Sequence, residues 1–214
     1  MDLRFALITE GVSEHRILKH ILQRYCEEEP EINQIQPQIV DNKQTSVGGW
    51  REVLRFCEER EADLLEILKY NEFIVIQIDT DMCQIDPFSV SKINAKGESL
   101  SEPELWEAVQ NRILNALPTS VPRERIILAI CIDMIECWLL PVYAKNRLQA
   151  CRTNNCLNHL NNDLRCNDIH IITNKNTAEA HKTYDTILKF LRKRKEIEQC
   201  ASFHFGFQKF IDNL

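Results

Sequence analysis

The sequence predicts an α/β fold in which a mostly parallel sheet is covered by helices on both faces. Two segments, residues 73–78 and 125–132, are almost wholly apolar, as the buried strands of parallel sheets are. Strand-like segments of this kind alternate along the chain with segments whose apolar residues recur at helical spacing. Residues 1–214 contain neither an internal repeat nor a Gly/Ser-rich linker, which favours one domain.

The elements follow one another in a regular order. Residues 3–9 form the first expected strand, and Ser13 is the N-cap candidate of the helix that follows. Further strands are expected at 35–40, 73–78, 125–132 and 169–173. Helices are expected at 50–69, 102–116, 134–148 and, at the C-terminal end, 177–195 and 199–213. An Asn- and Cys-rich stretch, residues 150–168, is interpreted as an insertion into the domain.

Composition limits the classes of function. A net charge of −6 argues against a protein that coats nucleic acid with a broadly basic surface. The longest uninterrupted apolar run, Ile126–Ile132, is too short to span a bilayer. The first fifteen residues lack the pattern of a secretory signal. We therefore expect a cytoplasmic protein that does not enter the membrane.

The nine cysteines have two interpretations. In a chain of this kind they are expected to be mostly reduced, small and partly buried. The alternative is a zinc site in the Asn-rich stretch, although the spacing matches no standard zinc finger. Its candidate ligands are Cys151, Cys156, His159, Cys166 and His170.

Acidic residues follow three of the expected strands. Glu10 comes after the first, Asp79 and Asp81 after the strand at 73–78, and Glu136 after the strand at 125–132. Ligands of open α/β sheets collect at the carboxyl ends of strands. Residues i and i+2 of an extended segment point the same way, so Asp79 and Asp81 can converge on one hard cation.

Each acid also has an ordinary interpretation when it is taken alone. Glu10 could be an acid that the helix dipole favours at a helix N-terminus. Asp79 and Asp81 could be turn residues, and Glu136 could be a solvated helix residue. The combination favours a metal site, because carboxylates gathered at one edge repel one another unless a cation neutralises them.

These motifs resemble a Toprim domain, which topoisomerases, primases and the overcoming-lysogenization-defect nucleases share. Residues 7–22, "LITEGVSEHRILKHIL", resemble the strand, Glu-Gly and helix that open the domain, and Asp79-Thr80-Asp81 resembles its later Asp-x-Asp motif. A closer likeness is to a family of short Toprim-like bacterial proteins with an "IExWLL" pattern, here residues 135–140. Thr9 stands where valine is usual, and residues 150–168 have no counterpart in the resemblance.

The resemblance implies Mg²⁺- or Mn²⁺-dependent hydrolysis of phosphodiester bonds in DNA, with bacterial anti-phage defence as its setting. Asp79, Asp81 and Glu136 would hold the metal, Glu10 would share a metal or act as general acid/base, and Lys182 would neutralise the scissile phosphate. The ordinary interpretation of Lys182 is an exposed helix residue. The chain has no GxxxxGK[ST] motif, so nucleotide hydrolysis would come from a partner ATPase.

A basic run at residues 189–195, "KFLRKRK", could contact a nucleic-acid backbone. Its cations are Lys189, Arg192, Lys193, Arg194 and Lys195. A solvated helix face paired with Glu196 and Glu198 explains the run equally well. The alternative to a nuclease is a non-catalytic Toprim-fold module that docks onto an ATPase, and the sequence leaves a homo-oligomer open.

Overall fold

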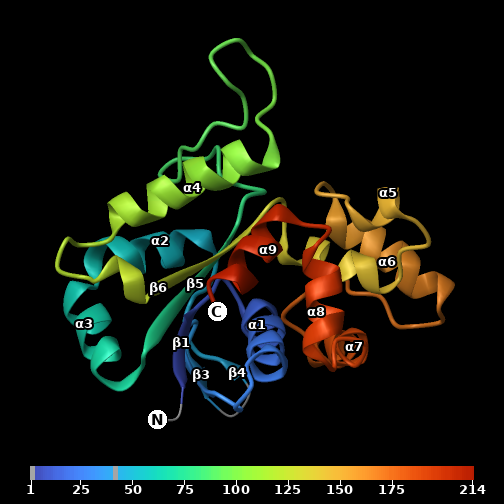
Figure 1. Ribbon diagram of the computed structural model, residues 1–214, viewed down its shortest axis with the longest axis horizontal. Helices are drawn as coiled ribbons and strands as arrows, with labels where there is room; N and C mark the ends of the chain where they lie inside the picture. Colours follow the sequence, from blue (N-terminus) through green and yellow to red (C-terminus); the bar gives the residue numbers. More distant parts are fainter. Residues whose placement is uncertain (1–2, 41–42) are drawn as a thin grey trace.

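The computed structural model describes residues 3–40 and 43–214 and is built around a four-stranded sheet (Figure 1). The strand order is β2–β1–β5–β6, and every neighbouring pair is parallel. The strands are β1 (Arg4–Ile8), β2 (Glu31–Gln36), β5 (Phe73–Asp79) and β6 (Ile126–Cys131). The predicted α/β class with a parallel sheet is therefore confirmed.

The remaining elements cover this sheet or extend from it. The helices of the first half are α1 (Val12–Tyr25), α2 (Trp50–Glu59), α3 (Glu61–Tyr70) and α4 (Glu102–Ala116). Those of the second half are the 3₁₀ helices η1 (Arg123–Arg125) and η2 (Ile135–Val142), then α5 (Arg147–Ala150), α6 (Cys156–Cys166), α7 (Ala178–Leu188), α8 (Arg194–Ala201) and α9 (Phe205–Asp212). A small antiparallel pair, β3 (Ile39–Val40) and β4 (Lys43–Gln44), follows β2.

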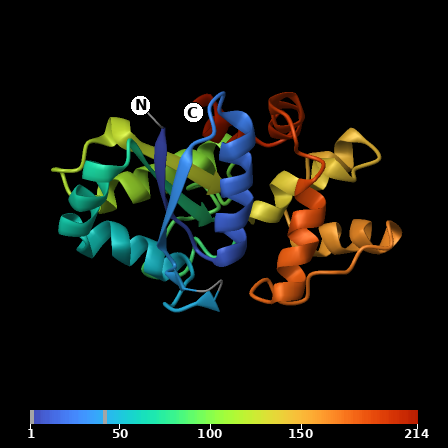
Figure 2. The same ribbon diagram turned by 90° about the horizontal axis from the view of Figure 1, so that it is seen from below.

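Side chains alternate between two hydrophobic cores, one on each face of the sheet. In β1, Phe5 and Leu7 join the core beneath α1, whereas Ala6 and Ile8 join the core beneath α2 and α4. Figure 2 shows α1 on one side of the sheet and α2 with α3 on the other. The chain therefore winds in opposite directions from β1 and from β5, which makes the carboxyl edge between these two strands the topological switch point.

Two predicted helices are interrupted. The helix expected over 50–69 breaks at Arg60, whose φ of −110° and ψ of 44° separate α2 from α3. The segment expected to be helical over 134–148 forms the 3₁₀ helix η2 and the short α5 instead. Pro141 lies inside η2, and a proline lacks the amide hydrogen that an α-helix would use. The C-terminal region, expected as two helices within 177–213, forms the three helices α7, α8 and α9.

The region from 150 to 173 also differs from expectation. The Asn- and Cys-rich stretch interpreted as an insertion, residues 150–168, contains α6, which buries Leu160 and Leu164. The strand predicted at 169–173 does not form. The Asn161 side chain accepts a hydrogen bond from Ile172 N at 2.7 Å and donates one to Ile172 O at 2.8 Å. A single side-chain amide thus satisfies the backbone groups that a neighbouring strand would have bonded.

No helix in the described part of the chain combines the length and the apolar character needed to cross a membrane.

One buried histidine makes stability depend on pH. His204 is 3% exposed at the start of α9, and burial lowers the pKa of its imidazole from 6.5 to about 4. The unfolded chain therefore takes up a proton at a pH where the folded chain does not, so we expect stability to fall as pH drops from about 6.5 to about 4. The loss approaches roughly 3 kcal/mol, since one pKa unit corresponds to about 1.4 kcal/mol.

Urea denaturation of the wild type and of His204→Gln across this pH range measures the effect. The variant should lose less stability than the wild type on acidification. Parallel pH profiles for the two proteins would show that His204 does not cause the dependence.

Candidate functional site

The sheet places Glu10 and Asp79 side by side at the topological switch point. Because Ile8 of β1 pairs with Ile76 of β5, the residues that follow the two strands meet at one edge. Asp79 N donates a hydrogen bond to Glu10 Oε1 at 2.6 Å, and Glu10 N donates to Gln77 Oε1 at 3.0 Å. Gln77 Nε2 in turn donates to Asp79 Oδ1 at 2.8 Å. The Glu10 carboxylate is thus held from the neighbouring strand β5, and the Asp79 carboxylate is held by Gln77 of its own strand.

A cleft of about 370 Å³ opens at this edge. Its lining includes Glu10, Glu14, Asp79, Asp81 and Lys175. A loop before α2 closes one side, where Gly49 N donates to Glu10 O at 2.7 Å. A Cβ on the preceding Gly48 would collide with the same carbonyl oxygen, so this close approach requires glycine.

Asp81 is exposed in the turn after β5 and is fixed through its backbone. The Asp133 carbonyl, which follows β6, accepts hydrogen bonds from Thr80 N and Asp81 N, both at 3.0 Å. Thr80 Oγ1 accepts one from Asp133 N at 2.8 Å. Asp133 has a φ of 63°, a left-handed conformation that aspartate tolerates better than most residues. The turn that carries Asp81 is therefore fastened to the end of the next strand.

Lys175 lies at the centre of the acidic groups. Its Nζ lies 2.7 Å from Glu14 Oε1, 3.0 Å from Glu136 Oε1 and 3.9 Å from Asp79 Oδ2. The backbone of its loop is tied to α1, since Ser13 Oγ donates to Lys175 O at 2.8 Å. Ser13 is consequently not the N-cap, a position that Gly11 occupies. One buried ammonium thus partly neutralises three carboxylates.

Glu136 is fully buried at the start of η2, behind the cleft. Its Oε1 accepts a hydrogen bond from the Tyr184 hydroxyl at 2.5 Å, besides its ion pair with Lys175. Its Oε2 is buried and has no hydrogen-bond partner among the described residues. A buried carboxylate oxygen without a partner is costly.

Burial and crowding raise the pKa values of Glu10, Asp79 and Asp81 in the cleft. Burial raises the pKa of Glu10 to about 8, although the hydrogen bond from Asp79 N lowers it. The negative charges of Glu14 and Asp81 raise it further. The pKa of Asp79 is raised well above its ordinary value by burial and by the charge of Glu10. The pKa of Asp81 is raised chiefly by burial. The cleft therefore favours binding of positive charge, either protons or a cation.

Burial alone would lower the pKa of Lys175, but the charges of Glu136, Glu14 and Asp79 raise it well above its ordinary value. Lys175 is therefore a permanent cation of the site.

Lys182 does not join the cluster. It lies on the exposed face of α7, whose buried face carries Thr183 and Tyr184, and it makes no ion pair within the described chain. The helix turns Lys182 outward, whereas Lys175, which precedes the helix, reaches the acidic groups.

The basic run lies far from the cleft. Its five cations are exposed, in the turn between α7 and α8 and at the start of α8. Arg194 stacks over Tyr25 with 4.4 Å from guanidinium carbon to ring centroid. Tyr25 ends α1, whereas Val12 begins α1 beside the cleft. A helix of 14 residues is about 20 Å long, which separates the run from the acids by roughly that distance. Arg194 also pairs with Glu198 at 2.9 Å, as the solvated-helix interpretation expects.

The five candidate zinc ligands of residues 150–170 do not assemble. Cys156 is joined to Cys137 by a disulfide, and Cys166 is exposed at the other end of α6. His159 Nδ1 lies 2.8 Å from the Arg152 guanidinium, and His170 lies 3.4 Å from Glu179.

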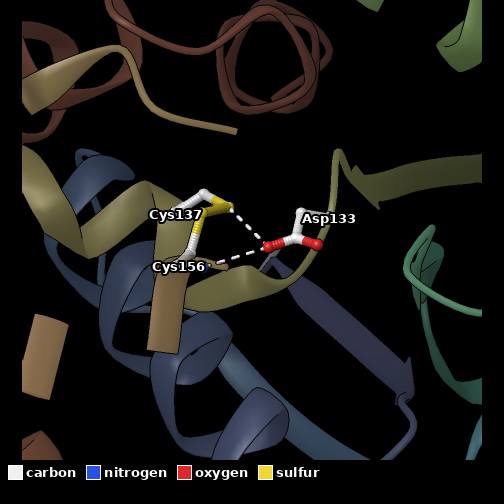
Figure 3. Close-up of side chains that lie close together, drawn as sticks. All are labelled: Asp133, Cys137 and Cys156. Atoms are coloured by element: carbon white, nitrogen blue, oxygen red, sulfur yellow. Dashed lines mark hydrogen bonds between the residues drawn. A yellow bond between two sulfur atoms is a disulfide. The ribbon is translucent and has the colours of Figure 1, made fainter. Parts of the chain in front are cut away.

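A different set could hold a metal. Asp133, Cys137 and Cys156 place potential ligand atoms within 4.8 Å of one another (Figure 3). Within the described residues this is the one group of three whose ligand atoms all lie within that distance. The carboxylate oxygens of Glu10, Asp79 and Asp81 line their shared cleft but do not all lie this close together. Cys137 and Cys156 are joined by a disulfide, which offers no thiolate.

Sequence reasoning missed Glu14, Lys175 and Tyr184. Glu14 carried a weak signal, since it lies four residues after Glu10 in the first helical turn. Lys175 lies in an Asn-rich loop without periodicity, and the sequence does not distinguish Tyr184 from an ordinary core residue of α7.

Fold and site together define an α/β protein with a lysine-bridged acidic cleft at the carboxyl edge of a parallel sheet. Comparison of the chain with protein-family models, with curated proteins and with solved structures finds no significant match.

Proposed function

We propose that this protein is a Toprim-class hydrolase that cleaves phosphodiester bonds in DNA with the help of Mg²⁺ or Mn²⁺. The observation that carries the proposal is the convergence of Glu10, Asp79 and Asp81 on one cleft at the topological switch point. Carboxylates brought together in this way are costly unless the site binds cations, and oxygen ligands are those that Mg²⁺ prefers.

The residues present fit a hard divalent cation. Asp79 and Asp81 would hold it, with Glu136 buried behind them, where Oε2 has no hydrogen-bond partner among the described residues. A divalent ion bound there would activate water and stabilise charge on the phosphate oxygens. The raised pKa values of Glu10 and Asp79 are the expected signature of carboxylates that lack such a neutralising partner.

The other residues of the cleft have roles that follow from their contacts. Glu10 lines the cleft with a pKa of about 8, which suits a group that exchanges protons near neutral pH. Lys175 replaces Lys182 as the lysine of the proposed mechanism. Its permanent charge at the cleft can bind a phosphate oxygen and stabilise the negative charge that develops there.

A second cleft supports a polyanionic substrate. It has a volume of about 400 Å³ and follows α1 away from the acidic site, with Val12 at the near end and Gln23 at the far end. Arg16 and Lys19 line it between these ends, at the spacing of one helical face, and Asp185 of the same cleft pairs with Arg16 at 2.9 Å. Beyond it, Arg194 of the exposed basic run stacks over Tyr25 in the last turn of α1. Cations spaced along about 20 Å of helix suit the phosphates of a DNA strand that leaves the acidic cleft.

The biological setting in this proposal is bacterial anti-phage defence in the cytoplasm. A partner ATPase would supply the nucleotide hydrolysis for which this chain lacks a GxxxxGK[ST] loop. Association with a second copy of the chain is compatible with the proposal and is not required by it.

A cleavage assay with Asp79→Asn tests the proposal. We expect wild-type protein to cut DNA with Mg²⁺ or Mn²⁺ and to stop on addition of EDTA. Asp79→Asn should reduce cleavage by about 100-fold or more, since removal of one preorganised electrostatic group costs about that much. Asp212→Asn, a change to an exposed residue at the end of α9, is the matched control and should cut normally. Cleavage that survives in Asp79→Asn would contradict the proposal.

The second candidate is a non-catalytic module that docks onto an ATPase. The observation that favours it is Lys175, because an ammonium that already pairs with Glu14, Glu136 and Asp79 can serve a purely structural network. This candidate expects no divalent-dependent cleavage of any DNA form, with or without the partner ATPase.

A further inference from the structure

The corner formed by Asp133, Cys137 and Cys156 has the composition of a metal site in its reduced form. Cys137 belongs to η2 and Cys156 begins α6, so the disulfide joins two elements 19 residues apart in sequence. Figure 3 shows the Asp133 carboxylate turned toward both cysteines. Asp133 Oδ2 accepts a hydrogen bond from Cys156 N at 3.1 Å and lies 4.0 Å from Cys137 Sγ.

We propose that reduction of the Cys137–Cys156 disulfide creates a binding site for one thiophilic divalent cation of the Zn²⁺ class. The ligands are the Cys137 and Cys156 thiolates and the Asp133 carboxylate, and water completes the coordination. The site is separate from the acidic cleft, and the inference does not depend on the proposed hydrolase activity.

The chemistry balances with a dithiol as reductant. Two electrons and two protons pass from the dithiol to the two protein sulfurs, so the S–S bond of the protein breaks and one forms in the reductant. Binding of the cation then releases the two thiol protons to solvent.

The surroundings keep the three ligands together after reduction. Cys137 is 1% exposed and Cys156 is not exposed, and their Cα atoms lie 5.0 Å apart. Both lie in the same hydrophobic core, which limits how far the sulfurs can separate. Asp133 is held in place by its backbone bonds to Thr80 and Asp81, and the hydrogen bond from Cys156 N orients its carboxylate. Because Asp133 is partly exposed, water can reach a cation bound by the three ligands, as in the open type of zinc site.

Ligand type separates this site from the acidic cleft. Thiolate sulfur selects Zn²⁺ and its chemical relatives, whereas carboxylate oxygens at the cleft select Mg²⁺ or Mn²⁺.

The other thiols of this region offer no competing site. Cys166 lies at the opposite end of the 11-residue α6, about 15 Å from Cys156, and is exposed.

Titration of the reduced protein with Co²⁺ tests the inference. The protein is reduced with a dithiol, freed of excess reagent under argon and titrated in excess Mg²⁺, which occupies oxygen sites. We expect thiolate-to-cobalt charge-transfer absorbance that saturates at one Co²⁺ per chain and disappears on addition of Zn²⁺. The oxidised protein should show no such band.

Variants assign the ligands. Cys137→Ser and Asp133→Asn should each weaken binding at least about 10-fold, since even residues that only hydrogen-bond to zinc ligands change affinity by about 10–100-fold. Cys166→Ser should bind like the wild type. Absence of the band in the reduced wild type, its persistence in Cys137→Ser, or its loss in Cys166→Ser would each overturn the proposal.

A second measurement covers the case in which a variant does not fold. Alkylation of the reduced wild type, followed by mass spectrometry, reports each thiol separately. Zn²⁺ should protect Cys137 and Cys156 and leave the labelling of Cys166 unchanged. Equal labelling of Cys137 and Cys156 with and without Zn²⁺ would contradict the site.

Discussion

Lys175→Met is expected to lower the free energy of unfolding by about 3–5 kcal/mol, because removal of one partner from a buried ion pair leaves the other charge uncompensated. The Lys175 side chain is 21% exposed, whereas the side chains of Glu14 and Glu136, which it pairs with, are 6% and 0% exposed. Methionine fills a similar volume, so the loss reports the charge and not a cavity. Urea denaturation at neutral pH measures it.

Two companion variants make this result specific. Lys182→Met changes an exposed lysine of α7 nearby and should alter stability by less than about 0.5 kcal/mol. Glu136→Gln in the Lys175→Met background removes the buried charge left behind and should restore part of the lost stability. Equal losses for Lys175→Met and Lys182→Met, or a double variant that is less stable than Lys175→Met alone, would contradict the ion-pair network.

Glu136→Gln alone is expected to reduce DNA cleavage by about 100-fold or more if the proposed activity is present, because it removes a charged group directly behind the cleft. It should also lower stability by about 1–3 kcal/mol, since glutamine weakens the contacts with Lys175 and Tyr184. From sequence alone we would expect little change in stability, because a Glu136 carboxylate without a partner would itself destabilise the folded chain. The pairing with Lys175 reverses that expectation.

Single-turnover cleavage and thermal melting of this variant, with and without Mg²⁺, measure both effects. Glu196→Gln, which changes a glutamate at the start of α8, is the control for activity. If Glu136→Gln cleaves DNA like the wild type and gains the same stability from Mg²⁺, Glu136 has no part in the site.

The sheet and its acids could be predicted because their signals are local. The strands β1, β5 and β6 are short apolar runs. Glu10 lies two residues beyond β1, and Asp79 is the last residue of β5. Once the sheet is assumed to be parallel, these strand ends must share an edge. The prediction therefore depended on the order of the strands and on no individual contact between residues distant in sequence.

Lys175 could not be predicted in the same way. It meets Glu14 across 161 residues of sequence, from a loop with no periodicity, so nothing local marks it. The strand expected at 169–173 failed for a related reason. Its local β-propensity is real, but the Asn161 side chain takes the Ile172 backbone bonds in the folded chain. The Cys137–Cys156 pair likewise depends on how α6 packs against η2.

Binding of Mn²⁺, followed by electron paramagnetic resonance and calorimetry, tests the central claim that the acidic cleft is a cation site. The claim concerns Asp79 most directly, because its backbone N–H donates to Glu10 and its carboxylate lies 3.9 Å from Lys175 at the switch point. We expect wild-type protein to bind Mn²⁺ in competition with Mg²⁺, and Asp79→Asn to lose that binding while Asp212→Asn retains it. Equal Mn²⁺ affinity in the wild type and in folded Asp79→Asn would contradict the account.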